Sequence, residues 1–393
     1  MFSIESKSLA LAIENKKPIK RVLTNQALNQ YNAVKEKTMR TFPILWVAVA
    51  LFVSACTTLG PGTVTQDRFD YTTALSESWK SQMLLNMVKL RYGDTPVFLD
   101  VASVINSYEV SGSANLGTSG TFNPSYQGIA SLGASGFYAN RPTITYSPST
   151  GEKFSKTMLT PIPPSSIFFF IQAGYNVEAV FRVLVQSING IRNRSGGIAG
   201  IRPADPQFYL LIERITRIQA SGAYEIRIQK STEREALAAV FSDKVDKKTE
   251  ADITEVRKML GLDPQAREFR VVYGSIASND KEIAILSRSV LQVIINLASY
   301  IEIPQTHVAE KRANPSPAEE TVEGSPVRPL LRIRSSSKKP EDAFAAVSYH
   351  NHWFWIDDKD LPSKGLFSFL MFIFNLVDTG IKEGAPVVTI PAR

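Results

Sequence analysis

The sequence is poor in the residues on which most catalytic and metal chemistry depends. Its 393 residues include one cysteine, Cys56, and three histidines, His307, His350 and His352. A single thiol cannot form a disulfide within the chain, and so few histidines leave little room for a Ser/His/Asp or Cys/His catalytic arrangement. The glycine-rich run at 191–201 also lacks the spacing of a phosphate-binding loop. These shortages favour a non-enzymatic protein.

The apolar run at 42–52 carries no charge, but it is too short to cross a bilayer core, which needs about 20 residues. Met39 and Arg40 precede this run, and the small residues 53–55 follow it. A positive flank, a short apolar run and small residues at its end are typical of an export signal. We therefore expect a signal peptide at 39–55, and we interpret residues 1–38 as an upstream extension created by a mis-assigned start.

The end of this signal, Val53-Ser54-Ala55-Cys56, resembles the lipobox of bacterial lipoproteins. The resemblance implies that a signal peptidase reads Val53, Ser54 and Ala55 and cuts before Cys56. It also implies that Cys56 carries a diacylglycerol on its sulfur and an acyl chain on its amino group. Two or more acyl chains hold a protein on a membrane far more firmly than one. Thr57 stands where an inner-membrane retention signal would have Asp, so the resemblance implies the outer membrane, with the body in the periplasm.

The high positive charge of the whole chain belongs mostly to its first residues. Residues 1–55 carry five of the seven net positive charges, and residues 56–393 carry a formal net charge of +2. So small a net charge does not favour nucleic acid as a partner.

Beyond the signal, the pattern predicts an α+β protein with mixed helices and short antiparallel strands. Apolar residues at helical spacing predict helices over 72–92, 177–188 and 280–298. The predicted divisions are a tether at 56–70, a main body at 71–303, a linker or loop at 304–329, and a C-terminal β-hairpin and helix unit at 330–393. This part of the chain also resembles uncharacterised lipoproteins of Gram-negative bacteria.

One long segment has no charged residue at all, from Val110 to Asn140. Glycine and serine are abundant there, and they alternate with apolar residues in two stretches that predict a β-hairpin at about 109–138. Ile129 and Phe137 interrupt the polar face of this pattern. The apolar positions are Val110, Ala114 and Leu116 in the first stretch and Ala130, Leu132 and Ala134 in the second. Such alternation over about ten residues is typical of a membrane-spanning β-hairpin. The alternative is a flexible surface hairpin or part of a soluble sheet, because glycine weakens a strand.

The candidate metal ligands are His350, His352 and Asp357. Residues two apart on a strand point the same way, so the two imidazoles could share a metal ion with the later carboxylate. The alternative is that Asn351 forms a hairpin turn, which would splay the two histidines apart.

The leading hypothesis is a lipid-anchored envelope protein with a non-enzymatic role in interaction or assembly, whose partners are the membrane and either an envelope protein or further copies of itself. A first alternative is a subunit of an oligomeric outer-membrane β-barrel pore that uses the hairpin at 109–138. A second alternative is an envelope enzyme with a metal site at His350 and His352.

Overall fold

The computed structural model describes residues 61–105, 108–119, 129–197, 200–230, 235–242, 244–318, 320–378 and 388–391. Cys56 and the other residues of the predicted signal lie outside the described residues. The chain divides into two units, Met1–Ser76 and Glu77–Arg393. The described part of the first unit is helical and belongs to α2, and all other described elements belong to the second unit.

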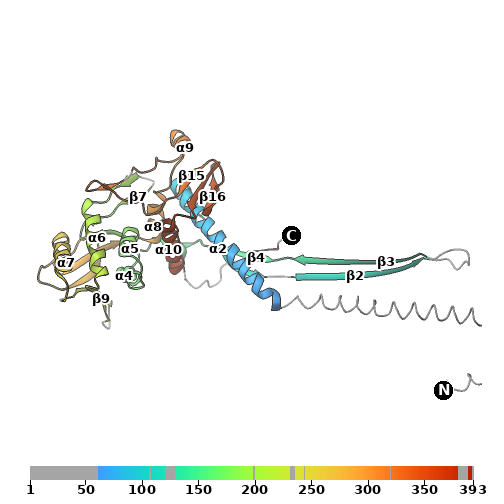
Figure 1. Ribbon diagram of the computed structural model, residues 1–393, viewed down its shortest axis with the longest axis horizontal. Coiled ribbons are helices and arrows are strands. Elements are labelled where there is room, and N and C mark those ends of the chain that lie inside the picture. Colours follow the sequence, from blue (N-terminus) through green and yellow to red (C-terminus); the bar gives the residue numbers. More distant parts are fainter. Residues whose placement is uncertain are drawn as a thin grey trace, which may run out of the picture. The chain divides into compact units, whose positions relative to one another are not determined.

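Figure 1 shows the arrangement of the chain and labels many of its helices and strands. The helices are α2 (Pro61–Arg91), α3 (Glu152–Leu159), α4 (Pro164–Gln172), α5 (Val177–Leu184), α6 (Pro206–Ala220), α7 (Lys247–Leu260), α8 (Val290–Ala298), α9 (Gln305–Ala309) and α10 (Leu361–Asp378). The strands of the first half are β1 (Leu99–Ile105), β2 (Tyr108–Ser119), β3 (Ile129–Asn140), β4 (Thr143–Pro148), β5 (Val185–Ile188), β6 (Ile191–Arg192), β7 (Ser195–Gly197) and β8 (Gly200–Arg202). The later strands are β9 (Tyr224–Lys230), β10 (Glu235–Phe241), β11 (Glu268–Tyr273), β12 (Glu282–Ser287), β13 (Thr321–Val322), β14 (Ser325–Pro326), β15 (Arg334–Ser336), β16 (Ala343–Tyr349), β17 (His352–Asp357) and β18 (Val388–Pro391).

These elements confirm the predicted α+β class. The largest sheet has the order β6-β5-β12-β11-β10-β9; its β11–β12 pair is parallel, and the others are antiparallel. Two three-stranded sheets have the orders β1-β4-β18 and β15-β17-β16. Within the described residues, no helix combines the length and the apolar character that crossing a membrane requires.

Helix ends follow local chemistry where the sequence supplies a cap. Asp246 accepts hydrogen bonds from the backbone N–H groups of Lys248 and Thr249 at the start of α7, and Gly261 ends that helix with a φ of 65°. Ser289 and Gln292 form a reciprocal capping box at the start of α8. Such caps satisfy N–H groups that would otherwise lack partners in the first turn.

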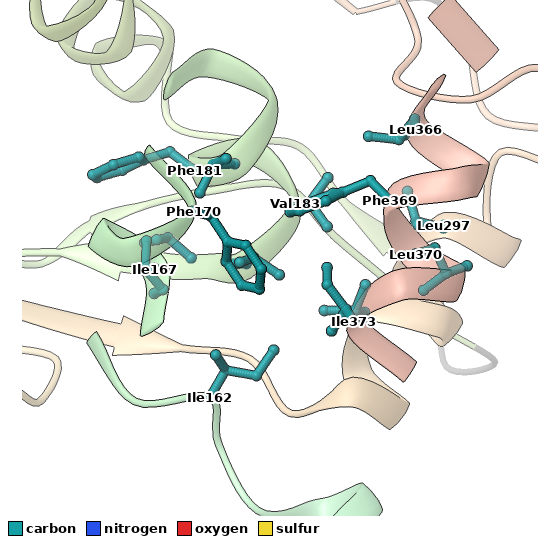
Figure 2. Packing of buried hydrophobic residues seen from close by; sticks show 14 of the residues in the cluster. Ile162, Ile167, Phe170, Phe181, Val183, Leu297, Leu366, Phe369, Leu370 and Ile373 are labelled. Carbon is teal, nitrogen blue, oxygen red and sulfur yellow. The ribbon is translucent and has the colours of Figure 1, made fainter. Parts of the chain in front are cut away.

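Buried side chains from α4, α5, α8 and α10 meet in the interior. Figure 2 shows Phe170 of α4 pointing toward Phe369 and Ile373 of α10, and the Phe170 and Phe369 ring centroids are 5.2 Å apart. Residues from 71–303 and from 330–393 therefore share one buried cluster.

Two predicted helices are wrong in their bounds. The helix predicted at 280–298 is strand β12 followed by α8, and Ile283 lies in the strand. Likewise, the helix predicted at 177–188 ends at Leu184 and continues as β5. Both strands lie inside the largest sheet, and the apolar run of β12 at 283–286 fits a buried strand as well as a helix.

Two of the predicted divisions contain regular structure. The segment predicted as a tether includes the start of α2 at Pro61. The segment predicted as a linker, 304–329, includes α9, β13 and β14. The buried Arg91 at the end of α2 ties this segment down by donating hydrogen bonds to the carbonyl oxygens of Asn314 and Pro315, each at 2.8 Å.

The buried guanidinium of Arg288 connects three backbone segments in the middle of the body. Nη1 of Arg288 donates to the carbonyl oxygens of Arg182 and Val183 at 2.8 Å, and Nη2 donates to the carbonyl oxygen of Arg194. Burial lowers the pKa of Arg288 to about 10, so the side chain stays charged at neutral pH. Arg288 therefore fixes the end of α5 and the loop before β7 to the β12–α8 junction.

We predict that Arg288→Met destabilises the fold by about 3 kcal/mol, because it removes a charged donor from three carbonyl oxygens, of which that of Arg182 keeps a bond from Asn193 at 3.0 Å. Urea unfolding measures the loss. Arg270→Met is the matched control: Arg270 is an exposed β11 residue paired with Glu282 at 3.6 Å, and its loss should cost at most about 1 kcal/mol. Equal losses in the two variants would contradict the structural role of Arg288.

Candidate functional site

The predicted hairpin is the outer part of one long antiparallel ribbon, and β18 joins the base of this ribbon as a third strand. Strand β1 pairs with β4 and β2 pairs with β3, both antiparallel. Ile105 is opposite Thr143, and Tyr108 is opposite Asn140, so the register is the same on both sides of the junction between the two pairs. We call the β2–β3 part, residues 108–119 and 129–140, the hairpin arm.

The register of the hairpin arm places apolar positions opposite each other. The pairs are Val110 with Tyr138, Ala114 with Ala134, and Leu116 with Leu132. The intervening positions are mostly serine, glycine and asparagine, as in the pair Ser113 with Ser135, but Ser111 is opposite Phe137 and Ser119 is opposite Ile129. Because side chains alternate between the two faces of a sheet, this register implies one face of mostly apolar positions and one face of mostly small polar positions. This agrees with the alternation predicted from sequence.

The polar face carries one hydrogen bond between the two strands and one exposed aromatic residue. The hydroxyl oxygens of Ser113 and Ser135 are 2.7 Å apart and share a hydrogen bond across the strands. Phe137 interrupts this face and is 51% exposed. At the base of the arm Glu109 and Arg141 form an ion pair at 3.8 Å, so charge returns where the arm joins the rest of the ribbon.

The long edges of the hairpin arm have no described partner strand. Among the described strands, β2 and β3 pair only with each other, whereas β18 pairs with β4 at the base of the ribbon. Proteins usually protect a free edge with charged residues, proline or a bulge. Apart from Glu109 at its base, the arm has neither a charged residue nor a proline, and its register has no bulge. The arm therefore offers a surface that another strand can join.

Each strand of the arm is long enough to cross a hydrocarbon core. β2 and β3 have 12 residues each. Twelve residues at about 3.4 Å each span roughly 40 Å, and a tilted transmembrane strand needs only about 9–11 residues.

A second candidate site gathers all three histidines of the chain. His307 of α9 is buried, and its ring centroid is 4.5 Å from that of His352 and 6.3 Å from that of His350. Tyr92, just after α2, shares a 2.6 Å hydrogen bond between its hydroxyl and Nδ1 of His307. Tyr349 packs against Tyr92 and donates a hydrogen bond to Asp94 at 3.0 Å. We call His307, His350 and His352 the histidine cluster.

The surroundings of the histidine cluster disfavour charge on its aromatic groups. Burial, followed by the nearby His352 and Arg312, lowers the pKa of His307. Burial also raises the pKa of Tyr92 and of Tyr349 to about 12. His307 and both tyrosines are therefore uncharged at neutral pH.

The candidate metal ligands are not brought together as the sequence pattern suggested. His350 and Asn351 have φ angles of 46° and 63°, which form the tight turn between β16 and β17. Asp357 is at the other end of β17, where it pairs with Arg334 at 3.5 Å. Within the described ranges, no group of three His, Cys, Asp or Glu side chains could hold a metal ion.

Sequence reasoning missed His307 and Tyr92 as members of a site. Neither is in a motif, and both are far along the chain from His350. The only signal in the sequence was the rarity of histidine, and rarity does not indicate that the three residues lie close together in the fold.

No family model matches the chain, and neither the curated proteins nor the solved structures contain a match to it.

The register of the hairpin arm predicts a specific disulfide. In a Cys56→Ala background, S113C/S135C should form an intramolecular disulfide under mild oxidation, because directly opposite residues lie within bridging distance. Peptide mass spectrometry identifies the bond. The matched control is S111C/S135C, a diagonal pair roughly 7–8 Å apart, which should not form it. Preferential bridging of the control pair would show that the register is different.

Proposed function

We propose that this chain is a lipid-anchored protein of the bacterial outer membrane, with its body in the periplasm, that acts in assembly and not as an enzyme. The observation that carries the proposal is the hairpin arm, with its apolar face and two unprotected edges. An apolar strand surface of this kind is stable when lipid or another strand covers it.

The anchor and the arm support each other physically. Lipid on Cys56 would hold every copy at one membrane surface. Concentrating the copies there would make pairing between their arms far more frequent than in free solution. The +2 net charge of residues 56–393 gives little electrostatic repulsion between copies.

The lipid anchor is tested by metabolic labelling. Labelled palmitate should enter the wild-type protein, and Cys56→Ala should abolish the label and release the body from the membrane fraction. Thr57→Ala is the matched control, because it alters the neighbouring residue and keeps the thiol, so its label should remain. A wild-type protein without label would refute the anchor.

A second candidate function is a subunit of an oligomeric outer-membrane pore, and the opposed apolar positions of the arm favour it. A single hairpin cannot insert alone, because its edge N–H and C=O groups would be unpaired in hydrocarbon. Several copies that pool their arms into one closed barrel would pair all these groups. The apolar face would then meet lipid, and the serine and glycine face would line the lumen.

Two neighbouring residues of β3 separate this candidate from a simple surface hairpin. Leu132 is opposite Leu116 and Ser131 is opposite Gly117, so the two residues occupy opposite faces. Leu132→Arg should put a charge into lipid at a cost of about 2–4 kcal/mol near the midplane and reduce membrane insertion. Ser131→Arg should face the lumen and insert like the wild type.

Extraction of membranes with alkaline carbonate, followed by native electrophoresis, measures insertion and assembly together. If both variants insert and assemble like the wild type, the arm is a surface hairpin and the pore candidate fails.

A further inference from the structure

Three segments that are far apart in the sequence meet at the histidine cluster. The end of α2 contributes Tyr92, α9 contributes His307, and the β16–β17 turn contributes His350 and His352. The Tyr92 ring also packs edge-on against the buried Phe354 of β17, with the ring centroids 5.9 Å apart. The cluster is therefore one of the contacts that hold the end of α2 on the body, beside the fully buried Met87 and Val88.

Charged and titratable groups surround the cluster on each segment. Lys89, Arg91 and Asp94 flank Tyr92, Glu310 and Arg312 follow His307, and Tyr349 precedes His350. Glu310 is paired with Arg312, whereas the charges of Lys89 and His350 act on Asp94. Asp94 can therefore offset the charge of one protonated imidazole, and further protonation within the cluster would add positive charge that no other carboxylate among these groups offsets.

We propose that the histidine cluster is a proton-sensitive clasp, which holds the end of α2 against α9 and the β16–β17 turn at neutral pH and releases it on acidification. The geometry of the cluster carries this inference, since three imidazoles share one small, partly buried site. Protonated imidazoles at these distances repel one another, and separation of the segments relieves that repulsion.

The direction of the pH effect follows from His307. Its pKa is lowered in the closed clasp, so the open form binds a proton more readily. The stabilisation is therefore fully present above the ordinary histidine pKa of about 6.5, and it is lost as the pH falls below that value.

Release of the end of α2 would also weaken the contacts that hold the start of the ribbon. The side chain of Asn86 exchanges hydrogen bonds with the backbone N–H and C=O of Val97, at 2.9 and 2.7 Å. Gln82 does the same with Leu99, the first residue of β1, at 2.7 and 2.9 Å. The last turns of α2 thus hold the start of the ribbon, so opening the clasp loosens the support of the hairpin arm.

The chain suits a decisive test because it has no histidine outside the cluster. Histidine is the only side chain whose ordinary pKa lies between pH 5 and 8. Hydrogen–deuterium exchange of the full chain in detergent, compared at pH 7.5 and 5.5 after correction for the intrinsic rate, measures local opening. Peptides covering 85–98, 305–312 and 345–354 should lose protection at the lower pH, by up to about tenfold per pH unit for one proton bound. Peptides from α7 and β11 serve as internal controls and should not change.

The variant H307Q/H350Q/H352Q should show equal protection at both pH values, because it has lost the groups that titrate. Wild-type protection that is unchanged by pH would overturn the proposal, and so would a pH response that persists in the triple variant. If the triple variant fails to fold, histidine-labelled wild type is measured by NMR. The His307 signal should titrate below pH 6.5, and titration at the ordinary value would overturn the proposal.

Discussion

The need of every backbone N–H and C=O group for a hydrogen-bond partner is the constraint on which this structure depends most. Along β2 and β3 that need is met on one side only, by the other strand of the hairpin arm. Water can satisfy the outer edges, but the arm has none of the charges or prolines with which proteins normally discourage a further strand. An arm of this composition is therefore suited to pair with a strand of a partner. The inference of an assembly role rests on this feature.

In the body, by contrast, many buried polar side chains form hydrogen bonds within the chain. Asn193 donates to the carbonyl oxygen of Val185 at 2.7 Å, and Asn189 bonds to the backbone of both α7 and β12. Arg194 pairs with Glu320 at 2.9 Å and donates to Ser299 at 2.8 Å. Such bonds join segments that are far apart in sequence and make the body a fixed support. The contrast between a closed body and an open arm is what points to the arm as the surface for association.

Features that depend on neighbouring residues were predictable from the sequence. The hairpin, the start of α6 after Asp205 and the end of α7 at Gly261 all follow from alternation, proline placement or glycine. Features set by distant partners were not predictable. β12 resembles a helix segment in sequence and becomes a strand because β11 and β5 flank it. The histidine cluster depends on α9 and the β16–β17 turn coming together, and no local pattern encodes that contact. The lipobox remains a prediction from sequence, because Cys56 lies outside the described residues.

The central claim is that the hairpin arm brings copies of this chain together at a membrane. The mass of the full-length protein after mild detergent extraction, measured by light scattering coupled to size-exclusion chromatography, tests it most directly. The account predicts a discrete oligomer of defined copy number. A monomer at every protein concentration would contradict it.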